Sequence, residues 1–427
     1  LIKMSPNNLE TDAEITSKYK EIIRANGITE EISEVIVADA GLRGEGFASQ
    51  SKIATVKFQN PDIKPLNLFV KTHTTNSSHS EMIDEVKAFE KESRFYMEYV
   101  PAAKEFCRTK GHEGLLDIYP KCYYGDNELV VFENIVVEKG YMLLPKDDMQ
   151  DLDAATLAIQ TLAKHHAISH AMIQKYGGPG EFFKQFPNLD FESFTRPAFR
   201  AMLQPALENA LNINIQLLEK YAVEGRDAAL AKCRPYVGRC FDVVTEKLQY
   251  NEDDEKLLLL NHGDYWNNNM LFSLDPETKK VNGHVAIDLQ VTRYNSPAVD
   301  LSYYIFTSVK PAVRRAHLQD LLRSYLATLQ GTSKDLGYPI DLTYEEIYLM
   351  VRKKLNYGFW FGVCFTFGPG LAVLKDIDMN AIGEVSNFAE VIRALIQKWI
   401  DNNPEQCAEL ARQFVGLMQE YEELSLE

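Results

Sequence analysis

Short apolar runs separated by turn residues fill the first part of the chain. Residues 35–38 and 52–58 are rich in β-branched side chains, and further apolar runs occupy 66–70 and 129–132. Runs of this length, bounded by Gly, Pro, Asn and Asp, are typical of β-strands. Residues 1–135 are therefore predicted to form a small, sheet-rich lobe.

Two stretches of this lobe have helical spacing instead. Residues 11–14 (Thr-Asp-Ala-Glu) form a capping box, and Gly27 is placed to end the helix that follows. A second helix is predicted from about residue 81 to residue 100. Its apolar face consists of Met82, Val86, Phe89, Tyr96 and Val100.

The remainder of the chain is predominantly helical in pattern. Residues 151–176 are rich in Ala and Leu, and residues 199–248 continue the helical spacing. Because 427 residues exceed one compact core, we predict a second, larger helical lobe over residues 136–427. Residues 357–374 carry no charge, but their Gly and Pro content makes a poor membrane-spanning helix, so a buried helix and loop is expected there.

Composition excludes several classes of function. A net charge of −16 without a basic stripe argues against nucleic-acid binding. The six Cys are scattered, as in a protein with reduced thiols, and the N-terminus lacks the layout of a signal peptide, so a cytoplasmic protein without a membrane partner is expected. His166 and His170 have metal-site spacing, but the Glu of H-E-x-x-H is missing, which favours a structural pair.

Three polar residues are placed where short apolar runs meet. Asp264 and Asn269 lie in one loop, and Asp288 follows a later run. The runs at 257–260, 270–272 and 285–287 predict the order strand, loop, strand, turn, strand. A tight loop of this kind aims Asp264 and Asn269 at one point, while Asp288 arrives from a neighbouring strand.

This set matches the needs of phosphoryl transfer. The reaction requires a carboxylate beside the attacking hydroxyl, and an amide with a second carboxylate to hold Mg²⁺ on the ATP phosphates. Asp264 is predicted to guide the proton, and Asn269 and Asp288 to bind the metal. The alternative is a hydrogen-bonded loop without chemistry.

Further residues fit the binding of ATP phosphates. Gly44 and Gly46 lie between two predicted strands, where glycine lets backbone N–H groups approach a phosphate, although a plain turn is the simpler interpretation of the motif alone. Lys71 ends a predicted strand, and Glu92 falls on the apolar face of the predicted helix. A carboxylate there needs a cation, and Lys71 is the candidate; the alternative is two solvated surface charges.

The motifs H-G-D-x-W-x-x-N-x-x-F over residues 262–272, I-D-x-Q at 287–290 and D-L at 300–301 resemble those of the ecdysteroid kinase-like proteins. That family is related to choline kinases and aminoglycoside phosphotransferases. The resemblance implies an α+β, bilobal, protein-kinase-like fold with a small β-rich N-lobe and a larger helical C-lobe. The protein-kinase segments H-R-D, D-F-G and A-P-E are not found.

The resemblance also implies roles for individual residues. Backbone groups of Glu133 and Ile135 would bind the adenine edge, with Asn134 where many relatives have Asp. Asp300 would brace the loop around His262, which orders the loop and is not the base. The same Lys71 and Glu92 appear in the family's V-K and F-x-x-E-x-x-F-Y motifs.

The resulting hypothesis is an ATP- and Mg²⁺-dependent small-molecule kinase. Aromatic residues at 357–367 and 182–199 suit a hydrophobic alcohol such as an ecdysteroid or a xenobiotic, although ordinary core packing explains them equally well. A choline or ethanolamine kinase is the enzymatic alternative, and a non-catalytic nucleotide-binding partner protein is the other. Both a monomer and a dimer are compatible with the sequence.

Overall fold

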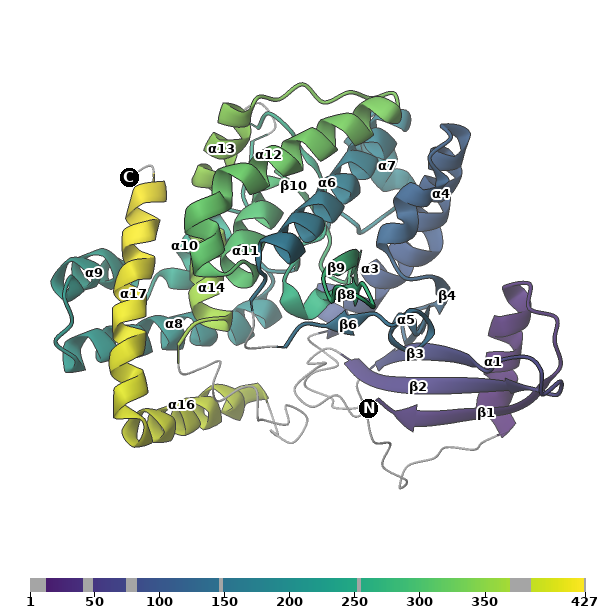
Figure 1. Ribbon diagram of the computed structural model, residues 1–427, viewed down its shortest axis with the longest axis horizontal. Helices are drawn as coiled ribbons and strands as arrows, with labels where there is room; N and C mark the ends of the chain where they lie inside the picture. Colours follow the sequence, from purple (N-terminus) through teal and green to yellow (C-terminus); the bar gives the residue numbers. More distant parts are fainter. Residues whose placement is uncertain are drawn as a thin grey trace.

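The smaller lobe is built on a five-stranded sheet (Figure 1). The computed structural model describes residues 13–40, 49–73, 83–145, 149–251, 255–368 and 385–425. The sheet order is β1-β2-β3-β5-β4, and neighbouring strands run antiparallel. The strands are β1 (Ile32–Asp39), β2 (Ser49–Phe58), β3 (Leu66–His73), β4 (Cys122–Gly125) and β5 (Leu129–Glu133). This confirms the sheet-rich unit, while the glycines at 44 and 46 lie outside the described residues.

The two faces of the sheet pack against different partners. Leu129 and Val131 belong to a small core that includes the buried face of α1 (Ala13–Ala25). Val130 and Phe132 instead join the large core of the molecule, where Phe132 packs edge-to-face on Tyr96. Successive side chains of a strand point to opposite faces, so this alternation also decides where the polar residues of the sheet point.

A long helix with a wide turn in its middle covers the second face. It consists of α3 (Ala88–Arg94), the π-helical turn η1 (Phe95–Tyr99) and α4 (Val100–Thr109). The helix predicted over 81–100 is thus interrupted at Lys87, which has φ of 57°, and extends nine residues further than expected. Pro101 provides a reason for the wide turn, because proline has no N–H to donate and its ring clashes with the carbonyl four residues earlier.

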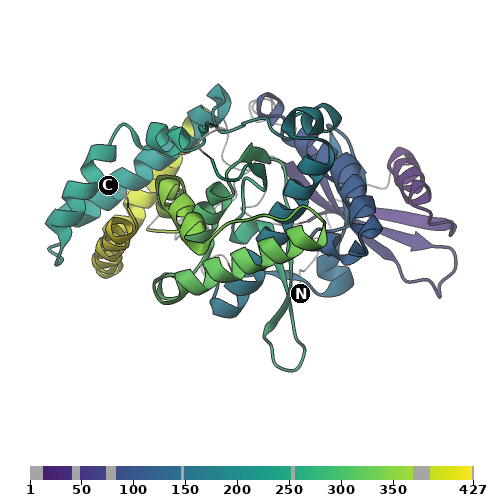
Figure 2. The same cartoon turned by 90° about the horizontal axis from the view of Figure 1, so that it is seen from above.

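The larger lobe is mainly helical, as predicted (Figure 2). Its helices are α5 (Ile135–Lys139), α6 (Leu152–Lys175), α7 (Pro179–Gln185), α8 (Pro197–Lys220), α9 (Arg226–Cys233), α10 (Cys240–Glu246), α11 (Ala298–Ser308), α12 (Pro311–Asp335), α13 (Tyr344–Lys353), α14 (Leu355–Phe365), α16 (Val385–Asn402) and α17 (Pro404–Leu424), with short 3-10 turns at Glu113–Ile118, Arg234–Tyr236 and Asn267–Asn269. None of the described helices is long and apolar enough to cross a bilayer.

Five short strands of the larger lobe position the segment that carries Asp264, Asn269 and Asp288. They are β6 (Met142–Leu143), β7 (Leu259–Asn261), β8 (Met270–Leu274), β9 (Val281–Ala286) and β10 (Arg293–Asn295). The predicted order of strand, loop, strand, turn, strand is confirmed. These strands belong to two separate sheets, however, because β7 pairs with β10, whereas β8 pairs with β6 and β9.

Two glycines bring α14 unusually close to α11. A Cβ atom added to Gly358 would lie 1.9 Å from the carbonyl oxygen of Ser302, and one added to Gly362 would lie 2.7 Å from that of Phe306. Real Cβ atoms do not approach so closely, so both positions require glycine. The apolar stretch that begins at residue 357 is thus a buried helix in backbone contact with its neighbour, as far as the structure describes it.

Candidate active site

Close contacts and hydrogen bonds fix the conformation of the loop after β7, which carries Asp264. Gly263 has φ of 90°, and a Cβ there would lie 2.0 Å from the carbonyl oxygen of Val291. Asp300, buried at the start of α11, accepts hydrogen bonds from the backbone N–H groups of His262 (2.7 Å) and Gly263 (2.9 Å). Burial would raise the pKa of Asp300, but its bond to His166 holds the pKa at about 2. An ionised Asp300 therefore braces the loop, as the family resemblance implied.

Two side chains fix the carboxylate of Asp264. Tyr303 donates its hydroxyl to Oδ1 at 2.7 Å, and Asn269 donates Nδ2 to Oδ2 at 2.8 Å. Burial raises the pKa of Asp264 to about 6; the Tyr303 bond opposes this rise, while the nearby charge of Asp288 adds to it. Each carboxylate oxygen accepts more than one hydrogen bond, so Asp264 still has capacity for a substrate hydroxyl.

The orientation of Asn269 makes it a plausible metal ligand. Its Nδ2 also donates to the backbone oxygen of Asp264 at 2.9 Å, so the amide oxygen is the end presented to a cation. The backbone N–H of Ile287 donates to the carbonyl of Asn269 at 3.0 Å, which brings Asp288 beside it. An amide oxygen and a carboxylate are the hard donors that Mg²⁺ prefers, so the predicted pair fits this ion.

A cluster of paired charges joins the two lobes on the side where ATP is expected. We call Lys71, Glu92 and Asp288 the ATP-side cluster. Lys71 Nζ lies 2.9 and 3.1 Å from the two oxygens of Glu92 and 2.8 Å from Oδ1 of Asp288. Burial opposes the charge of Lys71, but the two carboxylates outweigh it and hold its pKa above the usual value. The pairing with Glu92 was expected from the sequence, whereas the contact with Asp288 was not.

His262 orders the loop through both ring nitrogens. Nε2 lies 3.0 Å from the carbonyl oxygen of Ile287, and Nδ1 accepts the N–H of Asp264 at 3.4 Å. A carbonyl requires a donor, so Nε2 carries the proton and the ring is neutral. Burial lowers the pKa of His262, which agrees with this tautomer. A neutral ring with both nitrogens engaged does not serve as the base.

The segment predicted to bind adenine ends the sheet and starts α5. The N–H of Glu133 already donates to the carbonyl of Lys121 at 2.8 Å, so only its carbonyl remains for a ligand. Asn134 caps α5 by accepting the N–H of Val137 at 3.3 Å, which suits Asn as well as Asp. The N–H of Ile135 lies in the first turn of α5, where a helix provides no acceptor for it.

The aromatic residues proposed for the acceptor pocket do not all lie together. Phe359 and Trp360 are buried toward α17, and Phe182 and Phe186 pack on Tyr99, so these four belong to the core. Four others join Trp266 in a continuous row that we call the aromatic row, with successive ring centroids 4.6, 5.8, 5.4 and 5.5 Å apart: Phe199, Phe194, Phe361, Phe365 and Trp266.

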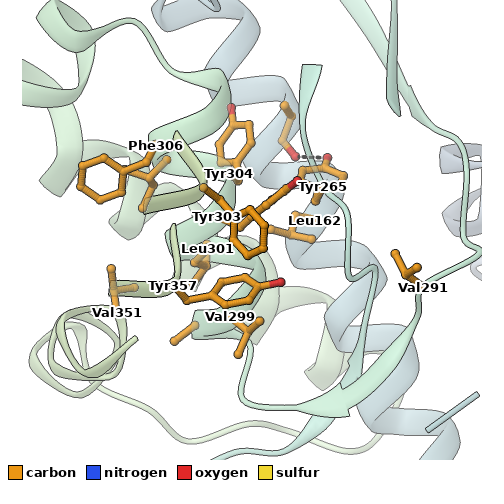
Figure 3. Close-up of a cluster of buried hydrophobic side chains, with 14 of the residues drawn as sticks. Leu162, Tyr265, Val291, Val299, Leu301, Tyr303, Tyr304, Phe306, Val351 and Tyr357 are labelled. Atoms are coloured by element: carbon orange, nitrogen blue, oxygen red, sulfur yellow. Dashed lines mark hydrogen bonds between the residues drawn. The ribbon is translucent and has the colours of Figure 1, made fainter. Parts of the chain in front are cut away.

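The aromatic row connects directly to Asp264. The ring of Tyr303 contacts Phe361 edge-to-face at 5.3 Å, and its hydroxyl reaches the Asp264 carboxylate. Figure 3 shows Tyr303 beside Tyr357, at a centroid distance of 5.8 Å. Phe199, Phe365 and Trp266 are partly exposed, while Phe194 and Phe361 are buried. Tyr303 was missed in the sequence, where only its spacing of three from Asp300 on one helix gave a signal.

Kinase-like phosphotransferases gather a loop carboxylate, a metal-binding amide and carboxylate, and a lysine of the sheet around one centre. This chain brings the same groups together and is a small-molecule member of that class. It belongs to the ecdysteroid kinase-like family, whose model matches residues 43–338.

Solved structures of other small-molecule kinases are also similar to this chain. An ethanolamine kinase of Plasmodium vivax has 11% identity and a TM-score of 0.42, with 92% of this chain and 91% of that one covered. A microcompartment-associated aminopropanol kinase has 12% identity and a TM-score of 0.41, with 93% of this chain and 99% of that one covered. The GDP complex of an aminoglycoside 2′-phosphotransferase variant has 15% identity and a TM-score of 0.39, with 92% of this chain and 99% of that one covered. No curated protein matches the sequence.

Proposed function

We propose that the protein transfers the γ-phosphoryl group of Mg-ATP to a hydroxyl of a hydrophobic alcohol, either an ecdysteroid or a xenobiotic. The observation that carries this proposal is the position of Asp264 between the ATP-side cluster and the aromatic row. Its carboxylate is near enough to Asp288 for their charges to interact, and Tyr303 links it to Phe361. A hydroxyl held at Asp264 on an apolar wall is thus next to the predicted metal ligands.

In this mechanism ATP supplies the phosphoryl group, and a bound Mg²⁺ ion would supply positive charge to its phosphates. Asn269 and Asp288 would hold that ion, and Lys71, which here pairs with Glu92 and Asp288, would pair with the phosphates. Asp264 orients the acceptor hydroxyl and receives its proton as the new O–P bond forms and the bond to ADP breaks. With a pKa of about 6, Asp264 is mostly ionised at neutral pH yet basic enough to hold that proton.

The aromatic row supports a hydrophobic acceptor. An apolar ring system laid on Phe199, Phe365 and Trp266 would remove aromatic surface from water, at about 25 cal/mol per Å². The acceptor hydroxyl would then be selected by its distance from Asp264 once the ring system is seated.

The test is detection of a phosphorylated product by mass spectrometry. The protein is incubated with Mg-ATP and a panel of ecdysteroids, phenolic and glucosidic alcohols, choline and ethanolamine. Asp264→Asn is measured beside it, and ATP binding is measured for both proteins. We expect a steroid or xenobiotic phosphate, with turnover at least about 10²-fold lower in the variant and ATP affinity little changed.

Two results would contradict the proposal in different ways. Full activity of Asp264→Asn would remove the role assigned to Asp264. Choline phosphate or ethanolamine phosphate as the main product would replace the hydrophobic acceptor by an amino alcohol.

A further inference from the structure

A second group of buried charges lies behind the aromatic row. We call Lys91, Glu192 and Arg293 the acceptor-side cluster. Arg293, in β10, is 1% exposed and donates Nη1 to the hydroxyl of Tyr357 at 2.8 Å. Its guanidinium carbon lies 4.2 Å from the ring centre of Phe194 and 5.8 Å from that of Tyr357. Its charge also reaches Asp264, the carboxylate proposed to hold the acceptor hydroxyl, where it lowers the pKa.

The charge of Arg293 is only partly compensated. Its Nε lies 3.3 Å from Oε2 of Glu192, without the geometry of a hydrogen bond. Within the described part of the chain, neither Nε nor Nη2 has a hydrogen-bond partner. Burial opposes the charge of Arg293, but Glu192 and Tyr357 hold its pKa above the usual range, so the cation is permanent.

Lys91 fixes the segment that carries Glu192. Its Nζ donates to the carbonyl of Phe191 at 2.7 Å and to the hydroxyl of Ser193 at 3.3 Å. Both partners are neutral, and burial lowers the pKa of Lys91 to about 7, so the lysine is a second cation only while it is protonated. The cluster therefore holds one permanent cation, one titratable cation and one carboxylate, and the carboxylate is the most exposed of the three side chains.

This arrangement works against the recognition of a cationic acceptor. Aromatic sites bind quaternary ammonium groups through the negative faces of free rings. Here Arg293 occupies a face of Phe194, and Phe199 stacks on the same ring, so a second cation on Phe199 would meet a like charge behind the two rings. Phe194 and Tyr357 are buried, so the interaction is screened less than one at the protein surface.

We infer that Arg293 determines the specificity of the acceptor site, so that it selects neutral or acidic hydroxyl compounds and rejects cationic amino alcohols. The inference rests on the proposed function, since it concerns the acceptor of the same reaction. It assigns no step of the chemistry to Arg293, which acts through its charge and through the rings it contacts.

Two acceptors of the same shape provide the test. Choline and 3,3-dimethylbutan-1-ol differ in having a quaternary nitrogen or carbon at one position. We expect the unsubstituted protein to prefer the neutral alcohol in kcat/KM and in binding measured by ligand-observed NMR. At an effective dielectric constant near 20, a like charge within 10 Å corresponds to a preference on the order of tenfold.

The variants remove the charge without leaving a buried carboxylate unpaired. Arg293→Met combined with Glu192→Gln removes one cation and one carboxylate; because Glu192 is the more exposed of the two, the preference is expected to fall, but by less than the effect of one unpaired charge. Arg293→Lys keeps the charge and is expected to retain the preference even where overall activity falls. The matched control is Arg234→Met with Glu219→Gln, an exposed pair 2.7 Å apart, which should leave the preference unchanged.

The outcomes separate this inference from the proposed function. Product from the neutral alcohol with an unchanged preference in the double variant overturns the role of Arg293 and leaves the kinase assignment intact. Equal values for the two alcohols in the unsubstituted protein, including no binding of either, also overturn it. A third result is a binding preference for the neutral alcohol that disappears in the double variant, while no alcohol of the panel gives product. It would support the role of Arg293 in specificity and contradict the proposed reaction.

Discussion

Lys91 and Glu92 are neighbours in α3 and serve two different charge clusters. Glu92 belongs to the ATP-side cluster, in which Lys71 contacts three carboxylate oxygens within 3.1 Å. Lys91 belongs to the acceptor-side cluster, where its partners are a carbonyl and a hydroxyl. The first cluster has an excess of carboxylate and the second an excess of cation, although both lie beside the same Asp264.

The difference separates two requirements of a small-molecule kinase. The ATP-side cluster has the composition that a divalent cation and phosphates need, whatever alcohol is phosphorylated. Among the described residues, no hydrogen bond or ion pair joins the acceptor-side cluster to Lys71, Asn269 or Asp288, so we assign its charge to the acceptor and not to the nucleotide. A comparison of equivalent substitutions in the two clusters therefore tests which one acts in catalysis and which one acts in selection.

The largest difference in turnover is expected between Lys71→Met and Lys91→Met. Without Lys71 the phosphates lose their cation, and turnover should fall by at least about 10²-fold. Lys91→Met should keep turnover within about fivefold, because its partners are neutral and a buried lysine is costly to keep charged. Steady-state kinetics with the identified acceptor measure both values. Similar losses in the two variants would show that the clusters do not have separate roles.

An intermediate effect is expected from Tyr303→Phe, at the point between the clusters. The Tyr303 hydroxyl stabilises the charged form of Asp264, so its removal should raise a pKa that already stands at about 6. The acid limb of the pH–rate profile should therefore move to higher pH, and kcat at pH 7 should fall about tenfold.

Tyr304→Phe is the matched control for that variant. Tyr304 is the next residue of α11 and equally buried, but its hydroxyl bonds Gln150 and the carbonyl of Ala155. An acid limb that moves in both variants, or in neither, would show that the bond to Asp264 does not set this pKa.

The smallest effect concerns stability as a function of pH. Burial lowers the pKa of Lys91 to about 7, so between pH 7 and its unfolded value the unfolded chain binds more protons and stability rises with pH. Relative to Lys91→Met, the parent protein should gain about 1 kcal/mol between pH 6 and 8. The pKa of Lys71 is raised, so its contribution is full below the unfolded pKa and stays constant over this range.

Denaturant unfolding at several pH values measures this difference. Lys71→Met should differ from the parent by a constant amount, whereas Lys91→Met should not. A constant difference for both variants would mean that Lys91 keeps its proton throughout this range.

Local patterns were sufficient to predict much of the fold and part of the site. Side chains alternate between the two faces of a strand, so with Leu68 and Val70 in the small core, Lys71 points to the other face of β3. The helical spacing of α3 places Glu92 on the side that meets Lys71. Both signals lie within a few residues of the position they predict. The apolar runs around Asp264 predicted its strands for the same reason.

The contacts that the sequence did not reveal connect distant segments. Arg293 meets Tyr357, 64 residues later, and Lys91 meets Ser193, 102 residues later, through the packing of whole elements. The division of the apolar stretch at 357–367 into core and aromatic row also depends on which face of α14 meets α11. Periodicity fixes the rows of a helix but not the neighbour that each row contacts.

The glycines of α14 have a consequence for how acceptor preference changes among related proteins. Because Gly358 and Gly362 hold the backbone of α14 against α11, a larger or smaller side chain at Phe361 or Phe365 cannot be absorbed by a shift of the helix. Each such exchange would be passed directly to the aromatic row, the surface proposed to meet the alcohol. A fixed helix whose successive turns can be varied independently allows new substrates to be acquired by single mutations, while the catalytic loop stays the same.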